Sequence, residues 1–415
     1  MASDPEPSPQ GAAPHASEMA AEKPFFFLHI RKTAGVSLRG LLANRFPADR
    51  ILFQAHSVSG PRQPNDALFA TGHVGFDYAR QFKAAPTIFT VLREPMARSM
   101  SAYDFFQSHS ETFLRHLATE LTEEEYQGRS RFQQRARELG PARFLAEEEK
   151  LARHWLANVQ TRQLAGAAFA DCPDDDPQLL DAALQNLAEV DLAGILERER
   201  DTLHLLGRIM GWGALGPLPH LNSTHGRRSE LDAGCRHILQ SWNELDLRLY
   251  VEACRLFDQK LRALPDEADT TAIATSLIGG RFTPDQPVHG HGWHEREYFA
   301  DRWLCWNSAP LATLNLRVRT ARPSRFKCLL SHVFSTHTLD RLGIALNGHR
   351  LDLRKRAVSD GILIEGDIAA TAWTADAHRA ALTFDCPVLG SPRDLDPASL
   401  DARQLGFALA WLELV

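Results

Sequence analysis

Three side chains that can hold an anion or move a proton stand just beyond apolar runs in the first hundred residues. They are Lys32, His73 and Arg93. Lysine and arginine bind oxyanions, and an imidazole accepts a proton near neutral pH. Each of the three follows a stretch typical of a buried strand, and ligands of parallel sheets bind beyond the carboxyl ends of the strands. The spacing therefore predicts that all three groups converge on a site for an anionic substrate.

The first of these groups lies in a loop between a predicted strand and a predicted helix. Phe25–Leu28 is an unbroken apolar run, typical of a strand buried on both faces of a parallel sheet. Residues 31–35 are small, cationic and hydroxyl-bearing, and apolar residues return at helical spacing after Ser37. Backbone N–H groups at a helix start face an anion, while Lys32 adds a charge and Thr33 and Ser37 add hydroxyl donors. This stretch is predicted to be an oxyanion cradle.

Alternating strands and helices are needed to place this cradle at a sheet edge. Further strands are predicted at 50–56, 67–71, 87–92 and 191–196. Helices are predicted at 76–82, 96–106, 155–166, 199–212 and 241–264, and Gly166 is the expected cap of the third. Strands that alternate with helices in this way predict a parallel α/β sheet with right-handed crossovers.

A charged stretch at 109–150 interrupts this alternation. It contains an acidic cluster at 123–125 and a basic run at 129–137. The favoured interpretation is a helical insertion with a solvated face, and the alternative is a lid over the substrate site.

The pattern changes to period-two alternation after about residue 279. Strands are predicted at 313–319, 381–384 and 407–414, and a hairpin at 343–353 turns at Asn347-Gly348. This pattern predicts a separate all-β sandwich. The expected organisation is a disordered tail at 1–23, an α/β domain at 24–265, a linker at 266–280 and a β-sandwich domain at 281–415.

Composition and charge limit the class of protein. The chain has 415 residues, enough for two domains with cores of their own. Its formal net charge of −6 argues against nucleic acid as a partner. We expect no transmembrane segment, because no apolar run approaches the ~20 residues that span a bilayer. We also expect no signal peptide, because the N-terminal stretch has neither a basic n-region nor an apolar h-region. Six cysteines without a CxxC pair predict reduced thiols and a cytoplasmic location, free or peripheral to the inner membrane.

Two common nucleotide-binding motifs do not fit the cradle. The kinase P-loop, GxxxxGK[ST], places its lysine after the glycines, whereas Lys32 precedes Gly35. The dinucleotide motif GxGxxG follows none of the predicted strands. ATP and a dinucleotide are therefore poor candidates for the bound anion.

Several stretches resemble the motifs of sulfotransferases. FLHIRKTAGVSL resembles the 5′-phosphosulfate loop, usually close to hIPKTGGTSL, and LREPMARSMSAYDFF resembles the 3′-phosphate clamp, LRDPxxRxxSxYxF. Between them, ATGHVGFDYARQF resembles the Gly-His segment of the carbohydrate sulfotransferases of family 2, which include the uronyl and heparan sulfate 2-O-sulfotransferases. WLANVQTRQLAG, VDLAGILERERDTLHLL and SWNELDLRLY are similar to later blocks of that family. The resemblance covers about residues 24–262, and its specificity lies in the combination.

This resemblance implies a P-loop-like sulfotransferase fold and an in-line transfer of a sulfuryl group. The donor would be 3′-phosphoadenosine 5′-phosphosulfate (PAPS), the acceptor a carbohydrate hydroxyl, and no metal would be needed. Lys32 would neutralise the leaving phosphate and His73 would be the general base. The implied nucleotide-binding residues are Arg31, Lys32, Thr33, Ala34, Gly35, Val36, Ser37, Arg93, Ser101, Ser223 and Thr224.

The loop departs from the family pattern at two positions. Arg31 stands where the family has Pro, and Ala34 where it has Gly. Arg31 either adds a cation near the phosphosulfate or points to solvent. Alanine at position 34 is a minor change if its φ is negative, but it crowds the phosphate if φ must be positive. His29 and His56 are rivals of His73 as the base, and we expect His29 to point away from the loop.

The C-terminal half contains a histidine-rich segment, HGHGWHEREYF, with His289, His291 and His294. No metal site is predicted there, because no Cys or Asp cluster accompanies the imidazoles. GWHEREYFADRWLCW and LDARQLGFALAWLEL resemble a β-sandwich module appended to bacterial glycan-modifying enzymes. Residues 281–356 carry 13 Lys/Arg against 6 Asp/Glu. This excess is either a solvated surface or a patch for an acidic saccharide or a membrane-linked glycan.

From these observations we expect a PAPS-dependent carbohydrate sulfotransferase with a glycan acceptor, for example one linked to the envelope or capsule. The alternative is a non-catalytic glycan-binding protein in which the nucleotide domain is vestigial. A nucleotide kinase is a third class. It would bind Mg-ATP rather than PAP, the 3′-phosphoadenosine 5′-phosphate product of sulfuryl transfer.

Overall fold

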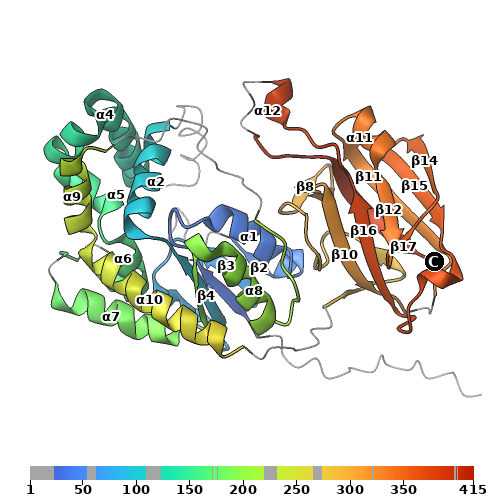
Figure 1. The fold of residues 1–415 in the computed structure, drawn as a ribbon, viewed down its shortest axis with the longest axis horizontal. Helices are drawn as coiled ribbons and strands as arrows, with labels where there is room; N and C mark the ends of the chain where they lie inside the picture. Colours follow the sequence, from blue (N-terminus) through green and yellow to red (C-terminus); the bar gives the residue numbers. More distant parts are fainter. Residues whose placement is uncertain are drawn as a thin grey trace, which may run out of the picture.

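The computed structural model contains an α/β region, at 23–264, and a C-terminal β-region, at 273–415 (Figure 1). The residues described are 23–53, 62–108, 123–170, 172–174, 176–218, 231–264, 273–319, 322–396, 399 and 401–415. The sequence-based predictions for residues 1–22, His56, Ser223 and Thr224 therefore lie outside the described residues.

A five-stranded sheet forms the centre of the α/β region. Its order is β2-β3-β1-β4-β5, and all of its strand pairs are parallel, which confirms the predicted parallel α/β sheet. The strands are β1 (Phe25–Leu28), β2 (Ile51–Leu52), β3 (Phe69–Gly72), β4 (Thr87–Leu92) and β5 (Leu192–Ile195). All four side chains of β1 are fully buried, as the unbroken apolar run predicts.

The strand order explains where a ligand can bind. The chain runs from β1 to β2 and β3 on one side, and then crosses to β4 and β5 on the other. The connection from β1 to β2 therefore leads to one side of β1, and the connection from β3 to β4 leads to the other side. In open α/β sheets such a reversal opens a crevice at the carboxyl ends of the strands.

Helices pack around this sheet, and those at 123–156 and 233–242 lie on the side away from the β-region (Figure 1). They are α1 (Gly35–Ala43), α2 (Pro95–Ser108), α4 (Glu123–Glu147), α5 (Glu149–Leu156), α6 (Val159–Ala165), α7 (Pro177–Glu189), α8 (Glu199–Ile209), α9 (Ala233–Trp242) and α10 (Glu244–Arg262). Short 3₁₀ turns lie at Ala48–Arg50, Phe76–Gln81, Ala167–Phe169 and Leu196–Arg198. None of the helices in the described ranges is long and apolar enough to cross a membrane.

The charged stretch after α2 forms packed helices. Phe132 and Phe144 of α4 are fully buried and pack with Phe106 of α2 and Trp155 of α5. Gly140, with φ 70° and ψ 172°, kinks α4 just before Pro141. The charged residues that dominate this part of the sequence therefore cover an apolar core that joins α2, α4, α5 and α9.

Two helices predicted to be continuous are each broken. The stretch 155–166 divides between α5 and α6 at Asn158, which has a left-handed φ of 45°. The stretch 241–264 divides between α9 and α10 at Asn243. The two breaks lie against each other: Asn158 N–H donates to Asn243 Oδ1 at 3.1 Å, and Asp246 N–H donates to Asn158 Oδ1 at 3.1 Å. Buried side-chain bonds between distant segments thus replace helical bonds that the local pattern favours.

The C-terminal β-region is built from two mainly antiparallel sheets, of order β13-β12-β16-β10-β6 and β14-β15-β11-β17-β9-β8, with β7 paired to β17. Its elements are β6 (Thr275–Ser276), β7 (Arg281–Phe282), β8 (Glu297–Phe299), β9 (Arg302–Trp306), β10 (Leu311–Arg317), β11 (Arg325–Val333), α11 (Thr336–Arg341), β12 (Gly343–Leu346), β13 (His349–Arg350), β14 (Leu353–Val358), β15 (Gly361–Asp367), β16 (Arg379–Asp385), α12 (Pro392–Leu395) and β17 (Phe407–Leu414), with a 3₁₀ turn at Ala370–Ala372.

One apolar core lies between these sheets, with Leu314 and Leu382 from the first and Cys328 and Leu412 from the second. The predicted hairpin at Asn347-Gly348 is confirmed: both residues have positive φ and join β12 to β13. Strand β6 falls inside the stretch predicted to be a linker and pairs with β10.

Candidate active site

The carboxyl ends of β1, β3 and β4 meet, as the sequence spacing predicts. The Arg93 guanidinium, just after β4, donates from Nη1 to the Lys32 carbonyl oxygen at 3.2 Å. His73, just after β3, is bonded through Nδ1 to the His29 carbonyl oxygen at 2.8 Å. Hydrogen bonds therefore tie both neighbouring strand ends to the loop that follows β1.

The backbone of this loop has an unusual conformation. Lys32 has a φ of 71° and Ala34 a φ of 62°, so two non-glycine residues lie in the left-handed region within three positions. That conformation costs an L-residue about 1–2 kcal/mol. When left-handed residues alternate with right-handed ones, successive backbone N–H groups turn toward one side and form an anion-binding concavity. Of the two possibilities left open for Ala34, the structure shows positive φ, the one in which a methyl group replaces glycine at a strained position.

His29 does not point away from the loop, so that sequence-based expectation is wrong. A Cβ atom added to Gly35 would lie 1.7 Å from Nε2 of the His29 ring, which therefore fills the space in front of this glycine. The His29 and His73 rings also contact each other, with centroids 4.3 Å apart. The turn after Leu28 directs His29 sideways, across the start of α1. Glycine at position 35 is thus required for the imidazole to pack there.

Lys32 lies at the centre of a cationic cluster. Its ammonium stands 3.6 Å from the centroid of the Phe105 ring. Burial, together with the nearby guanidinium groups of Arg93 and Arg98, lowers the pKa of Lys32 to about 7, while Asp104 opposes the shift. The ammonium is therefore held where an added anion would be strongly favoured.

The other residues of the predicted site differ in how deeply they are buried. Thr33 is fully buried, and its hydroxyl donates to the Ile30 carbonyl oxygen at 2.9 Å within the loop. Ser37 and Ser101 are half-buried on α1 and α2, and Val36 is exposed. The N-terminus of α2 is capped from within the chain, because the Glu94 carboxylate accepts from the N–H groups of Met96 and Ala97.

Two glutamines on α6 hold the strand ends in place. Gln160 brackets Arg93: its Oε1 accepts from the Arg93 N–H at 2.9 Å, and its Nε2 donates to the Arg93 carbonyl oxygen at 2.9 Å. Gln163, one turn later, donates from Nε2 to the carbonyl oxygens of His29 and Val74, at 2.9 and 3.1 Å. The sequence analysis assigned no role to either residue. Their signal is a pair of amides at i, i+3, which places both on one face of the helix.

The helix that bears these glutamines is itself anchored by a buried carboxylate. Asp246 of α10 accepts from the Thr161 N–H and hydroxyl at 2.7 Å each, and burial raises its pKa. Arg98, only 1% exposed, donates to the Leu156 carbonyl oxygen at 2.7 Å beside the break between α5 and α6. Sequence reasoning missed Arg98 and Asp246 as well, because their partners lie about sixty and eighty-five residues away in the chain.

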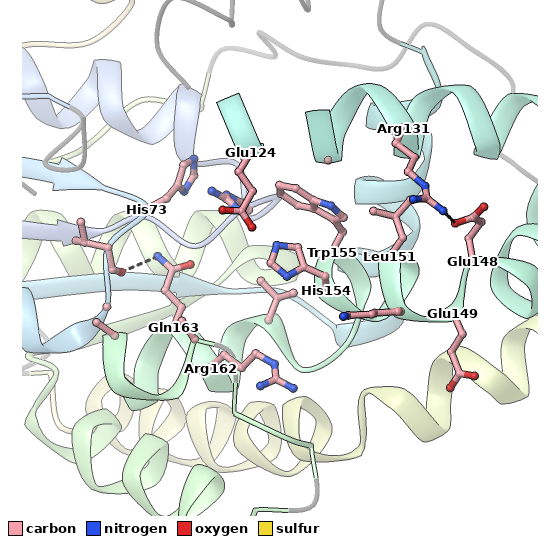
Figure 2. Close-up of a pocket in the computed structure, with 18 of the residues that line it drawn as sticks. His73, Glu124, Arg131, Glu148, Glu149, Leu151, His154, Trp155, Arg162 and Gln163 are labelled. Carbon is pink, nitrogen blue, oxygen red and sulfur yellow. Dashed lines mark hydrogen bonds and ion pairs between the residues drawn. The ribbon is translucent and has the colours of Figure 1, made fainter. Parts of the chain in front are cut away.

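His73 opens onto a cavity of about 880 Å³, a size suited to a small-molecule ligand. Figure 2 shows His73 and Gln163 at one end of it and the Arg131–Glu148 ion pair at the other. Its charged lining residues are Arg31, Glu124, Arg131, Glu147, Glu148, Glu149, Lys150 and Arg162, with His154 beside them. Helices α4 and α5, from the charged stretch, therefore form a wall of this cavity. Arg31 also lies over the Trp155 ring, 5.2 Å from its centroid, rather than projecting away from the site.

A carbonyl oxygen can only accept a hydrogen bond, so the bond to His29 shows that Nδ1 of His73 carries the proton when the ring is neutral. Nε2 is then the unprotonated nitrogen, which is the one that can act as a base. His73 thus lines the cavity, and the Lys32 ammonium and the backbone of its loop lie close by, at the same end of the sheet. This arrangement can remove a proton from a neutral group and stabilise charge on a leaving oxyanion.

The three histidines of the histidine-rich segment are buried or half-buried. No group of three or more His, Cys, Asp or Glu side chains suited to a metal ion occurs in the part of the chain that the structure describes. His289 and His294 are buried, which lowers their pKa to about 3 and about 4 respectively. His294 Nε2 is instead bonded to the Gln404 carbonyl oxygen at 2.9 Å.

Comparison with known proteins gives local similarity to one group of enzymes. The chain is 29% identical to heparan-sulfate 6-O-sulfotransferase 2 of Gallus gallus over 111 residues, which are 25% of this chain and 28% of that protein. It is 29% identical to heparan-sulfate 6-O-sulfotransferase 3 of Homo sapiens and 30% identical to heparan-sulfate 6-O-sulfotransferase 1-B of Danio rerio, each over 111 residues, or 24% and 27% of those proteins. The chain spans about a quarter of the length of these curated relatives. No protein-family model matches it.

These similarities support a carbohydrate sulfotransferase family in general. The relatives are named for 6-O transfer, so they do not support the resemblance to the 2-O enzymes in particular.

Proposed function

We propose that this protein transfers the sulfuryl group of PAPS to a hydroxyl of a glycan. The observation that carries the proposal is the meeting of Lys32, Arg93 and His73 around the carboxyl end of β1, beside a cavity that can hold a sugar. The local similarity to heparan-sulfate sulfotransferases supports the same class of reaction. On this proposal the parallel sheet is a P-loop-like sulfotransferase domain at 24–265.

The donor half of the site would bind two phosphate groups. Backbone N–H groups of residues 31–37 and the Ser37 hydroxyl would hold the 5′-phosphosulfate, which suits the left-handed turns at Lys32 and Ala34. Arg93 and Ser101 would hold the 3′-phosphate. Arg31 would add a cation at the border between this loop and the cavity. Ser223 and Thr224 remain assigned to the nucleotide by resemblance alone.

The reaction would be an in-line displacement at sulfur. The acceptor hydroxyl gives its proton to Nε2 of His73 while its oxygen bonds to the sulfur atom. The bond between sulfur and the bridging phosphate oxygen breaks, and its electron pair stays on that oxygen. Lys32 neutralises the charge that builds there. The products are a sulfate ester and PAP, so atoms and charge balance without a metal.

The acceptor would occupy the cavity between His73 and helices α4 and α5. Its lining carries both signs of charge, and Glu148 is already paired with Arg131 and Arg135. The α4–α5 wall is in the position that a lid over the acceptor would need. We further propose that the C-terminal β-region is a β-sandwich domain at 281–415 that accompanies the transferase domain.

The direct test is incubation of the full chain with ³⁵S-labelled PAPS and a panel of uronic-acid and neutral polysaccharides. We expect label in at least one polysaccharide, and stoichiometric release of PAP. PAP should also raise the melting temperature of the protein, whereas Mg-ATP should not. Stabilisation by Mg-ATP alone would favour a kinase. PAP binding without transfer to any acceptor would favour the glycan-binding alternative.

The two glutamines of α6 give a prediction that separates donor binding from turnover. Gln160→Ala removes the bracket around Arg93 and should weaken PAP binding about tenfold, the effect of losing roughly 1–1.5 kcal/mol of hydrogen bonding. Gln163→Ala frees the His29 and Val74 carbonyls and should lower kcat with little change in PAP affinity. Titration calorimetry with PAP and steady-state kinetics measure the two effects. Equal loss of PAP affinity in both variants would contradict this division of roles.

A further inference from the structure

The helix that starts at the phosphate-binding loop ends against the C-terminal β-region. The last carbonyl groups of an α-helix have no partner within the helix and must find one elsewhere. At the end of α1, the carbonyl oxygens of Ala43 and of the capping residue Asn44 find partners in residues 284–296, about 250 positions later in the chain. This segment lies between β7 and β8 and belongs to neither of the two core sheets.

Arg296 makes most of this connection. Its Nη2 donates to the carbonyl oxygens of Ala43, at 2.7 Å, and of Phe46. Its Nη1 donates to the carbonyl oxygens of Pro284 and Gln286, at 2.9 and 2.8 Å. The side chain is 6% exposed, and burial lowers its pKa to about 10, so the guanidinium still carries its charge at neutral pH. A cation here also opposes the negative end of the α1 dipole.

The two residues that follow Ala43 strengthen the contact. Asn44 donates from Nδ2 to the His294 carbonyl oxygen at 2.8 Å, and its own carbonyl oxygen accepts from the Val288 N–H. Arg45 is buried, and its Nη2 donates to the Gly290 carbonyl oxygen at 2.6 Å. The end of α1 is thus bonded to the histidine-rich segment at several successive residues.

The side of α1 is held as well. Arg39 forms an ion pair with Glu295 at 3.0 Å. A Cβ atom on Gly40 would lie 3.0 Å from the Glu295 Cβ, so glycine allows the helix and the segment to approach closely. These contacts fix the rotation of α1 about its axis as well as its position.

The histidine-rich segment is held just as closely from its other side. A Cβ atom on Gly290 would lie 1.8 Å from the Thr313 carbonyl oxygen, and one on Gly292 would lie 2.4 Å from that of Leu311. The two glycines therefore allow the segment to lie directly on β10. The segment has the rigid β-region on one side and α1 on the other. Its composition, which suggested metal ligands, reflects this packing.

A second part of the proposed donor site touches the same segment. Gly216 packs against His291, at a distance that leaves 2.8 Å between a Cβ atom on Gly216 and the His291 Cβ. Residues 216–218 lead directly into 219–230, which include Ser223 and Thr224. The histidine-rich segment therefore contacts both α1 and the stretch that precedes residues 219–230.

We propose that the C-terminal β-region fixes the position of the phosphate-binding loop through α1, and that Arg296 is the positioning residue. This inference rests on the proposed function for its link to PAP. Helix α1 has nine residues and is about 13 Å long, so it moves as one rigid unit. Anchoring its carboxyl end therefore anchors the N–H groups at its amino end. Arg296 touches no substrate and acts only by holding this helix.

The test compares Arg296→Gln with Arg403→Gln in the full chain. Arg403 is a matched control, because it forms ion pairs with Asp401 and Glu297, within the β-region. We expect Arg296→Gln to weaken PAP binding about tenfold. Arg403→Gln should change PAP affinity by less than about twofold, although the melting temperature of this variant falls. Arg296→Lys should be intermediate, since an ammonium keeps the charge but reaches fewer carbonyl groups.

Hydrogen–deuterium exchange provides a readout that does not depend on nucleotide. Exchange in peptides that cover 31–44 should rise in Arg296→Gln and stay unchanged in Arg403→Gln. Unchanged exchange there, with unchanged PAP affinity, would overturn the inference. If the unsubstituted chain binds no PAP, the proposed function fails, and the exchange experiment still decides whether Arg296 positions the loop. Should Arg296→Gln not fold, Glu295→Ala should show the same rise on a smaller scale, and its absence would also overturn the inference.

Discussion

His73→Ala is expected to lower the rate of sulfuryl transfer by about 10²–10⁴-fold, the range for loss of a general base. The bond from Nδ1 to the His29 carbonyl oxygen, at 2.8 Å, fixes the orientation of the ring and leaves Nε2 as its unprotonated nitrogen. PAP binding should survive, because His73 lies on the acceptor side, among the residues that line the cavity. The measurements are kcat with a sulfated product readout and the Kd of PAP.

The matched control for this variant is His154→Ala. His154 lines the same cavity from α5 but follows no strand end. We expect it to raise KM for the acceptor more than it lowers kcat. Full turnover by His73→Ala, together with loss of turnover in His29→Ala, would transfer the role of base to the neighbouring imidazole, whose ring centroid is only 4.3 Å away.

Lys32→Ala is expected to reduce transfer by about 10³-fold or more, because charge on the leaving phosphate then lacks its nearest cation. The same residue predicts an unusual pH dependence of nucleotide binding. Its pKa lies near 7 instead of the ordinary 10.5, so in the free protein the ammonium is protonated below this value and neutral above it. An anion favours the protonated form. PAP affinity should therefore be highest below pH 7 and should fall as the pH rises toward 9.

Calorimetry in buffers of different ionisation enthalpy tests this linkage. At pH 7 the binding of PAP to the unsubstituted protein should take up about half a proton at Lys32. In Lys32→Ala this contribution should vanish. Lys83→Ala is the control, since Lys83 forms an exposed ion pair with Asp66 on the surface. Proton uptake that persists in Lys32→Ala would assign the titration to another group.

The sequence was most informative where one residue pattern decides the structure. The apolar run Phe25–Leu28 marked β1 to the residue, and Thr87–Leu92 marked β4, because a strand buried on both faces leaves no freedom in composition. The general rule for parallel sheets then placed Lys32, His73 and Arg93 at one edge. Period-two alternation identified β17 equally well, with identical bounds.

Features that depend on distant partners were not predictable in this way. The breaks at Asn158 and Asn243 exist because the two buried asparagines bond across eighty-five positions, and each local sequence alone favours a continuous helix. The direction of His29 depends on the space in front of Gly35. Gln160 and Gln163 become informative only when α6 is known to cross the ends of β1, β3 and β4.

The position of Arg296 also has a consequence for how the protein is made. Ala43 and Arg296 are 253 positions apart, which corresponds to roughly 10–50 s of synthesis at ~5–20 residues per second. The rest of the α/β region is synthesised within that interval, while the end of α1 still lacks its partner. The buried Asn44 and Arg45 stay exposed until the segment 284–296 emerges. The proposed nucleotide site would therefore be completed late, by residues translated after it, and a chain interrupted before residue 296 would leave the ribosome with α1 unanchored.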